Sequence, residues 1–157
     1  MKLCLPRILA GVALASMVVP SSWAQVSVAI ENVQSLSFGS FAAGNGGSVT
    51  VSTNGSRNAG GGVVLIRSSQ GMAAQFTVSG DSNAAYTIQL PGNDFVSLTG
   101  PGTDMFINNF VSTPSGVEGK LGAGGSQALS VGGTLNVGSD QAPGSYSGTF
   151  SVTVSYN

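Results

Sequence analysis

Short runs in which apolar and polar residues alternate make up most of the chain after residue 24, and clusters of glycine, serine and asparagine separate them. Alternation indicates strands, because successive side chains of a strand point to opposite faces of a sheet. The separating clusters are typical of turns. The chain is therefore predicted to be all-β, an antiparallel sandwich with strands near residues 26–30, 36–41, 48–53, 62–68, 75–79, 85–90, 95–99, 105–111, 128–137 and 145–156. The stretch at residues 128–137 is either one strand or two strands with a bend at Gly132-Gly133.

Two kinds of strand are expected. Val63-Val64-Leu65-Ile66 is unbroken apolar sequence, which favours a central strand covered on both faces. Residues 48–52 alternate as a half-exposed strand does. Two glycine-rich connections, residues 54–62 and 112–126, are predicted to be long loops at the ends of the sandwich.

Residues 1–24 are interpreted as a secretory signal. A basic start and an apolar run precede Ser22-Trp23-Ala24, a small-x-small site of the kind that signal peptidase recognises. Cleavage between Ala24 and Gln25 would leave one domain, residues 25–157. The protein is thus predicted to be exported to the periplasm, the cell surface or the extracellular space, with no membrane span after the signal is removed.

The composition after the signal excludes several classes of function. Three basic side chains stand against six acidic ones, which is too few to neutralise a phosphate backbone and excludes nucleic acid as a partner. There is no histidine and no cysteine, so Ser-His-Asp and Cys-His nucleophile systems and zinc clusters are excluded. No disulfide can form, and packing alone must hold the domain. No cofactor is expected.

The remaining candidates for chemistry fit turns or solvated charges better. Asp94 and Asp104 could meet across a hairpin as a glycosidase pair, but each follows a Pro-Gly turn, where aspartate caps local backbone. Lys120 lies among glycines, which favours a solvated charge over a desolvated nucleophile. Gly80-Asp81-Ser82-Asn83 has the oxygen ligands of half a calcium loop without the rest. The protein is not expected to be an enzyme.

The most regular alternation lies at the C-terminal end. One face of the last predicted strand carries Tyr146, Gly148, Phe150, Val152, Val154 and Tyr156, while serine and threonine occupy the other face. Two interpretations stay open. The segment is either the last core strand of a closed sandwich, or a strand whose neighbouring edge is completed by an extended segment of another chain.

Two sets of residues resemble those of known protein families. The ending, with Gly144, Tyr146, the apolar row and the penultimate Tyr156, resembles the closing motif of subunits of chaperone-usher fimbriae. Nearly the whole chain after the signal is also similar to a bacterial domain-of-unknown-function family of short secreted proteins and to spore-coat-protein-U-like sandwiches. This second resemblance rests on Leu36-Ser37-Phe38-Gly39, residues 71–80, Leu135-Asn136-Val137-Gly138 and residues 143–150.

The fimbrial resemblance implies an immunoglobulin-like, pilin-like β-sandwich that lacks or borrows one edge strand. It implies like subunits or a periplasmic chaperone as partners, which would pair beside the last strand. Val26, Val28 and Ile30 alternate as a donor strand would. The chain departs from the fimbrial pattern in lacking a disulfide, and the segment before Leu36 is short for both a donor and a first strand.

The function that we expect is that of a cell-surface or secreted structural or adhesive protein of fimbrial or coat type, assembled by β-strand complementation. The alternative is a self-contained binding module that recognises glycans or matrix through its loops. The chain has no tryptophan after the signal, and Tyr86, Tyr146 and Tyr156 lie on predicted strands, which count against this alternative.

Overall fold

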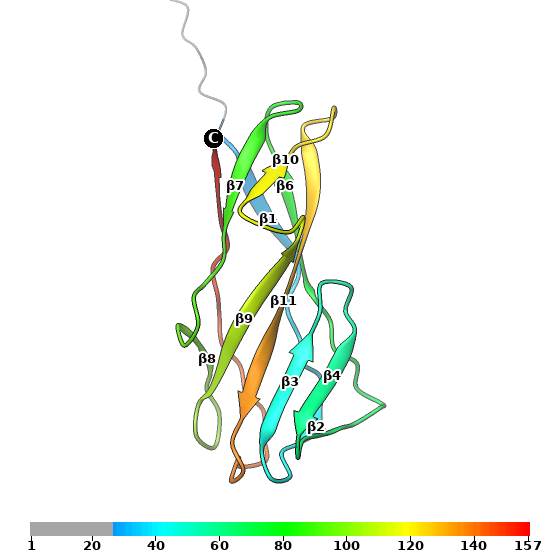
Figure 1. Cartoon of the computed structure of the whole chain (residues 1–157), viewed down its shortest axis with the longest axis vertical. Helices are drawn as coiled ribbons and strands as arrows, with labels where there is room; N and C mark the ends of the chain where they lie inside the picture. Colours follow the sequence, from blue (N-terminus) through cyan, green and yellow to red (C-terminus); the bar gives the residue numbers. More distant parts are fainter. Residues whose placement is uncertain (1–26) are drawn as a thin grey trace, which may run out of the picture.

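The computed structural model describes residues 27–157 as an elongated molecule of strands and turns (Figure 1). No helix occurs among these residues, and so none is long and apolar enough to cross a membrane. All strand pairs are antiparallel, which confirms the all-β prediction. The strands are β1 (Ala29–Gln34), β2 (Phe41–Ala42), β3 (Gly47–Val51), β4 (Arg57–Gly61), β5 (Val64–Leu65), β6 (Ala74–Ser79), β7 (Ala85–Gln89), β8 (Val96–Leu98), β9 (Met105–Thr113), β10 (Glu118–Lys120), β11 (Ser126–Val137) and β12 (Thr153–Tyr156).

The larger sheet is organised by β11. One edge of β11 pairs first with β6, over residues 126–131, and then with β3, over residues 133–137. The opposite edge pairs with β9. The sheet continues from β6 to β1, from β3 to β4 and from β9 to β8. The stretch at residues 128–137, predicted as one strand or as two, is therefore a single long strand.

Glycine at positions 132 and 133 allows β11 to change partners. Both residues are buried, and a Cβ on Gly132 would collide with the carbonyl oxygen of Val51 on β3. The register between β11 and β9 also shifts between Gly132 and Thr134. The neighbouring backbone approaches so closely that only a residue without a side chain fits.

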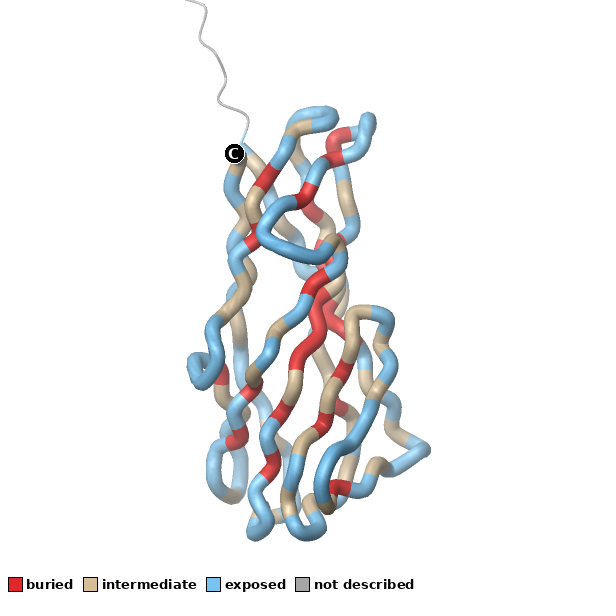
Figure 2. Tube along the Cα trace, viewed as in Figure 1, coloured by how far each residue is buried: buried red, intermediate tan, exposed pale blue. Residues whose placement is uncertain are grey.

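Two hydrophobic cores lie one above the other along the molecule. With the C terminus at the top, as in Figure 1, the upper core lies between β6 and β11 and a smaller sheet ordered β10-β7-β12. It includes the fully buried Val78, Tyr86 and Leu129. The lower core lies against β3, β9 and the second half of β11, and includes the fully buried Val49 and Leu135. Figure 2 shows the buried residues following these strands.

Two local predictions are wrong. Residues 63–66 do not form a covered central strand: only Val64 and Leu65 pair, with β2, and Val64 is 62% exposed. An apolar run does not by itself reveal what covers it. The connections at residues 54–62 and 112–126 are not plain loops, because they contain β4 and β10. Both strands are edge strands and carry no apolar alternation.

Candidate functional site

The lower core borders a groove of about 950 Å³ that has an apolar floor and separates two extended segments. One side of the groove is residues 35–43, called here the N-terminal wall. The other side is residues 141–150, which lead into β12. The floor comes from the strands of the larger sheet and includes Val96, Leu98, Met105, Ile107 and Leu135. Among the residues that the structure describes, none that lines the groove is charged.

The apolar row of the C-terminal segment, residues 144–156, is incompletely covered. Tyr146, Phe150, Val152, Val154 and Tyr156 are all half-buried, and the serine and threonine residues between them are exposed. Half-buried and exposed residues therefore alternate along the second half of this segment. None of the five is fully buried, unlike the inward residues of β3 or β6, and Figure 2 shows no buried residue along this segment. These side chains, which are of the kind that fills a protein core, are thus only partly covered.

The middle of the C-terminal segment also lacks backbone partners. Ser147 exchanges two hydrogen bonds with Thr99, and β12 pairs with β7. Between these points, residues 148–152 form no backbone–backbone hydrogen bond within the described chain. The predicted strand at residues 145–156 therefore forms a ladder only at its end. The free N–H and C=O groups are those that an added strand would use.

The upper end of the groove is closed by aromatic packing. The Phe150 ring lies 6.3 Å from that of Phe76 and 5.3 Å from that of Phe110, measured between centroids. These side chains connect the upper and lower cores. An occupant of the groove would therefore lie along the lower core and stop near Phe150.

Arg57 at the start of β4 fixes the N-terminal wall. Its guanidinium donates to the carbonyl oxygens of Phe38 at 2.8 Å, Ser40 at 3.0 Å and Ile66 at 2.9 Å. One planar guanidinium group therefore joins the N-terminal wall to the segment that contains β5, and these two segments have few backbone pairs of their own.

We expect Arg57→Gln to lower the free energy of unfolding by about 2–3 kcal/mol, because it removes charge-assisted hydrogen bonds to three carbonyl groups. Arg57→Lys should recover only part of the loss, since a single ammonium cannot reproduce the planar fork. Urea denaturation measures both variants. Equal stability of the lysine variant and the wild type would contradict the proposed role of the fork.

Tyr146 fixes the other side of the groove. Its hydroxyl donates to the carbonyl oxygen of Ala142 at 2.8 Å and accepts from the N–H of Gly102 at 2.9 Å. Gly144, between them in the chain, has φ of 147°, where a side chain would be strained and would meet Pro101. The turn at residues 142–146 is thus tied to the loop that follows β8.

We expect Tyr146→Phe to lower the free energy of unfolding by about 1–3 kcal/mol, because both hydrogen bonds of the hydroxyl are lost while the aromatic ring is retained. Tyr156→Phe is the matched control: its hydroxyl accepts one hydrogen bond, from the N–H of Asp81 at 2.7 Å. Thermal or urea unfolding should show the smaller loss for the control. A larger loss at Tyr156 would contradict the assignment.

Two of the proposed donor residues, Val28 and Ile30, belong to the upper core rather than to the groove. Val26 lies outside the described residues, as do Ala24 and Gln25 of the proposed cleavage site. Val28 precedes β1 and packs against the upper core, and Ile30 lies within β1 opposite Val78 of β6. In the isolated chain, Ile30 thus belongs to a strand of the chain's own sheet.

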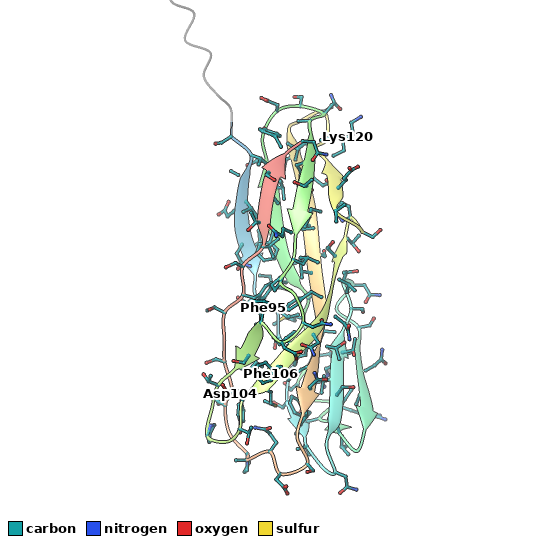
Figure 3. All side chains as sticks on the ribbon, turned by 60° about the vertical axis from the view of Figure 1, so that its left-hand side comes forward. Phe95, Asp104, Phe106 and Lys120 are labelled. Carbon is teal, nitrogen blue, oxygen red and sulfur yellow. The ribbon has the colours of Figure 1, made fainter. Side chains whose placement is uncertain are left out.

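The charged candidates are not brought together. Asp94 accepts a hydrogen bond from Asn108 at 3.1 Å at one end of the β8–β9 ladder, whereas Asp104 lies beyond the other end. Lys120 is exposed on β10, and Figure 3 places it near the upper end of the molecule, far from Asp104. Within residues 27–157, no three acidic, histidine or cysteine side chains cluster as metal ligands.

An exposed aromatic pair was missed from the sequence. Phe95 is 86% exposed and Phe106 is 41% exposed, and both lie around the β8–β9 hairpin (Figure 3). Asn93 and Asp94, in the turn that precedes β8, form hydrogen bonds with Asn108 and Asn109 of β9. Both phenylalanines lie on predicted strands, and a position on a strand does not distinguish an exposed ring from a buried one.

Comparison with family models finds a match over residues 28–156, to a family described as a domain of unknown function, DUF4402. Neither the curated proteins nor the solved structures contain a match.

Proposed function

The chain belongs to the DUF4402 family, whose description assigns no activity, and from the groove we propose that it is an exported structural or adhesive subunit of a bacterial surface, completed by a β-strand from another chain. What supports the proposal is the combination of an open apolar groove with five consecutive residues, 148–152, whose backbone is unpaired. A strand laid in the groove would cover the floor and pair with that backbone in one step.

Two further features support a pilin-like, immunoglobulin-like arrangement with one strand missing. Tyr146 hydrogen-bonds to backbone upstream of it at the start of the last strand, as the tyrosine corner of such sandwiches does. Within residues 27–157, β12 pairs with β7 and with no other strand, which leaves its second edge free. In this proposal the protein has no catalytic role, and its partners are like subunits or a chaperone.

The test places a charge in the groove. Leu98 lies in the groove and is half-buried, so Leu98→Glu leaves the carboxylate access to water in the empty groove but buries it unpaired once a strand enters. The matched control is Ser97→Glu on the same strand, whose side chain points to the opposite face. Protein exported to a bacterial periplasm is then compared on an unboiled denaturing gel and by size-exclusion light scattering.

We expect detergent-resistant oligomers from the wild type and from Ser97→Glu, and monomers from Leu98→Glu. Circular dichroism and thermal unfolding check that the Leu98 variant is folded. A wild type that stays monomeric, or a folded Leu98→Glu that assembles as well as the wild type, would contradict the proposal.

A second candidate function, a self-contained module that binds glycans, is favoured by the exposed Phe95 and Phe106. Exposed aromatic rings beside amide and carboxylate groups suit a sugar, which offers both apolar and hydroxyl surface. Binding of the wild type to a panel of neutral oligosaccharides, lost in Phe95→Ala while assembly is unchanged, would favour this function over the first.

A further inference from the structure

The outer face of the larger sheet carries a row of polar side chains from four adjacent strands. Successive residues of a strand point to opposite faces, and Val49, Ile107 and Leu135 point into the lower core. Their neighbours therefore point outward, and the register aligns one residue from each of β4, β3, β11 and β9: Asn58, Thr50, Thr134 and Asn108. These four residues are called here the amide–hydroxyl row. None of them lines the groove, which lies on the inner face.

The amide–hydroxyl row carries no charge and offers hydrogen-bonding groups to a ligand. The hydroxyls of Thr50 and Thr134 lie 3.0 Å apart and bond to each other, which leaves each oxygen a further lone pair. Asn58 is exposed on β4, at the edge of the sheet. The amide of Asn108 is held in place by Asp94, with which it forms two hydrogen bonds. The row is thus a strip of uncharged donors and acceptors.

The exposed aromatic pair lies at the β9 end of the row. Phe106 points outward, since Met105 and Ile107 on either side of it are buried, and it is opposite Ser97 of β8. Phe95 follows Asp94, which is bonded to Asn108 of the row, and its ring is 86% exposed. Figure 3 shows both rings beside this hairpin. Apolar rings exposed together on one face mark a contact surface.

A neutral sugar chain matches this combination of groups. The C–H faces of a sugar ring pack on aromatic rings, and its hydroxyls both donate to and accept from amides and hydroxyls. An anionic polymer would meet no cation in the row. The apolar core of a protein interface would leave the amides and hydroxyls buried without partners. The surface therefore favours an uncharged carbohydrate over either of these ligands.

The length of the row favours an extended chain over a single sugar. Three strand spacings separate Asn58 from Asn108, which is about 14 Å. We propose that the outer face binds an extended, neutral polysaccharide that crosses β9, β11, β3 and β4, with Phe95 packed on one of its rings. This inference rests on the second candidate function, glycan binding, and extends it from the aromatic pair to the whole sheet. It does not depend on the groove.

The test measures retardation of the protein in native gels that contain one polysaccharide each. The neutral polymers are hydroxyethylcellulose, galactomannan and dextran, and alginate is the anionic comparison. Phe95→Ala and Asn58→Ala change the two ends of the surface. Val117→Ala is the matched control: Val117 is 69% exposed but bonds through its carbonyl oxygen to Ile88 of β7, in the smaller sheet. Thermal unfolding checks that each variant is folded.

We expect at least one neutral polymer, and not alginate, to retard the wild type. Affinity should fall about tenfold in Phe95→Ala and about fivefold in Asn58→Ala, and should be unchanged in Val117→Ala. Leu98→Glu should bind the polymer as the wild type does, because Leu98 points to the inner face.

Three results would overturn the inference in different ways. Full binding by Asn58→Ala together with loss in Phe95→Ala would overturn the role of the row but leave glycan binding by the aromatic pair. Equal retardation by alginate would overturn the neutral class of ligand. A wild type that no neutral polymer retards would overturn the inference and the second candidate function together, while the groove assembly tested with Leu98→Glu would stand or fall separately.

Discussion

Replacing Gly132 by alanine is expected to lower the free energy of unfolding by about 3 kcal/mol or more, a large part of a typical domain's stability. The new Cβ would collide with the carbonyl oxygen of Val51 on β3. The atom in its way belongs to backbone, so no side chain can rotate aside. β3 and β11 could separate only by breaking the ladder that runs from Gly133 to Val137. Urea denaturation measures the loss.

Gly124→Ala is the matched control for Gly132→Ala. A Cβ on Gly124 would have no heavy atom within 4 Å, and the loss there should stay within about 0.5 kcal/mol. Similar losses at the two positions would mean that the effect comes from glycine itself rather than from the crossing of strands at Gly132.

Removing the side chain of Tyr86 is the second large effect that we expect, with Tyr86→Ala losing about 3–5 kcal/mol of unfolding free energy. The ring is fully buried in the upper core and fills the space above Gly119 of β10. Its hydroxyl donates to Oε1 of Gln127 at 2.7 Å. Tyr86→Phe keeps the ring and should lose only about 1–2 kcal/mol. A phenylalanine variant as unstable as the alanine variant would contradict the dominance of packing.

Tyr86 should also make the stability depend on pH under alkaline conditions. Burial raises the pKa of Tyr86 above its ordinary value of 10.0. The folded state therefore keeps the phenolic proton to a higher pH than the unfolded state does. The contribution of Tyr86 is fully present below about pH 10 and is lost as the pH rises through the folded pKa. Unfolding free energies measured above pH 10 should fall more steeply for the wild type than for Tyr86→Phe, and parallel curves would refute this assignment.

The sequence was sufficient to predict strands whose alternation reflects a buried face. β3, β6 and β7 bury alternate residues, and each lies within two residues of its predicted position. β4 and β10 were missed because edge strands rich in glycine or charge are fixed by the backbone of a neighbour, which leaves no apolar pattern. The segment at residues 63–66 was misjudged, because coverage depends on elements distant in sequence.

The groove could be predicted only in part. The alternation from Tyr146 to Tyr156 indicated one strand beside it, and the sequence left open whether that strand has an open neighbouring edge. What leaves the groove open is the separation between the N-terminal wall and residues 141–150, which are about a hundred residues apart in the chain. Arg57, which positions the wall, gave no sequence signal, since its partners are carbonyl groups rather than acidic side chains.

The absence of charge from the groove lining determines how assembly through it should respond to solution conditions. Ionic strength in the physiological range should change the affinity little, because there are no ion pairs to screen. Sulfate salts should strengthen association and cooling should weaken it, since burial of apolar surface is then the main favourable term. Binding in the groove should also carry a negative heat-capacity change. Oligomers that are stabilised mainly by the burial of apolar surface would dissociate more readily in the cold than at high salt.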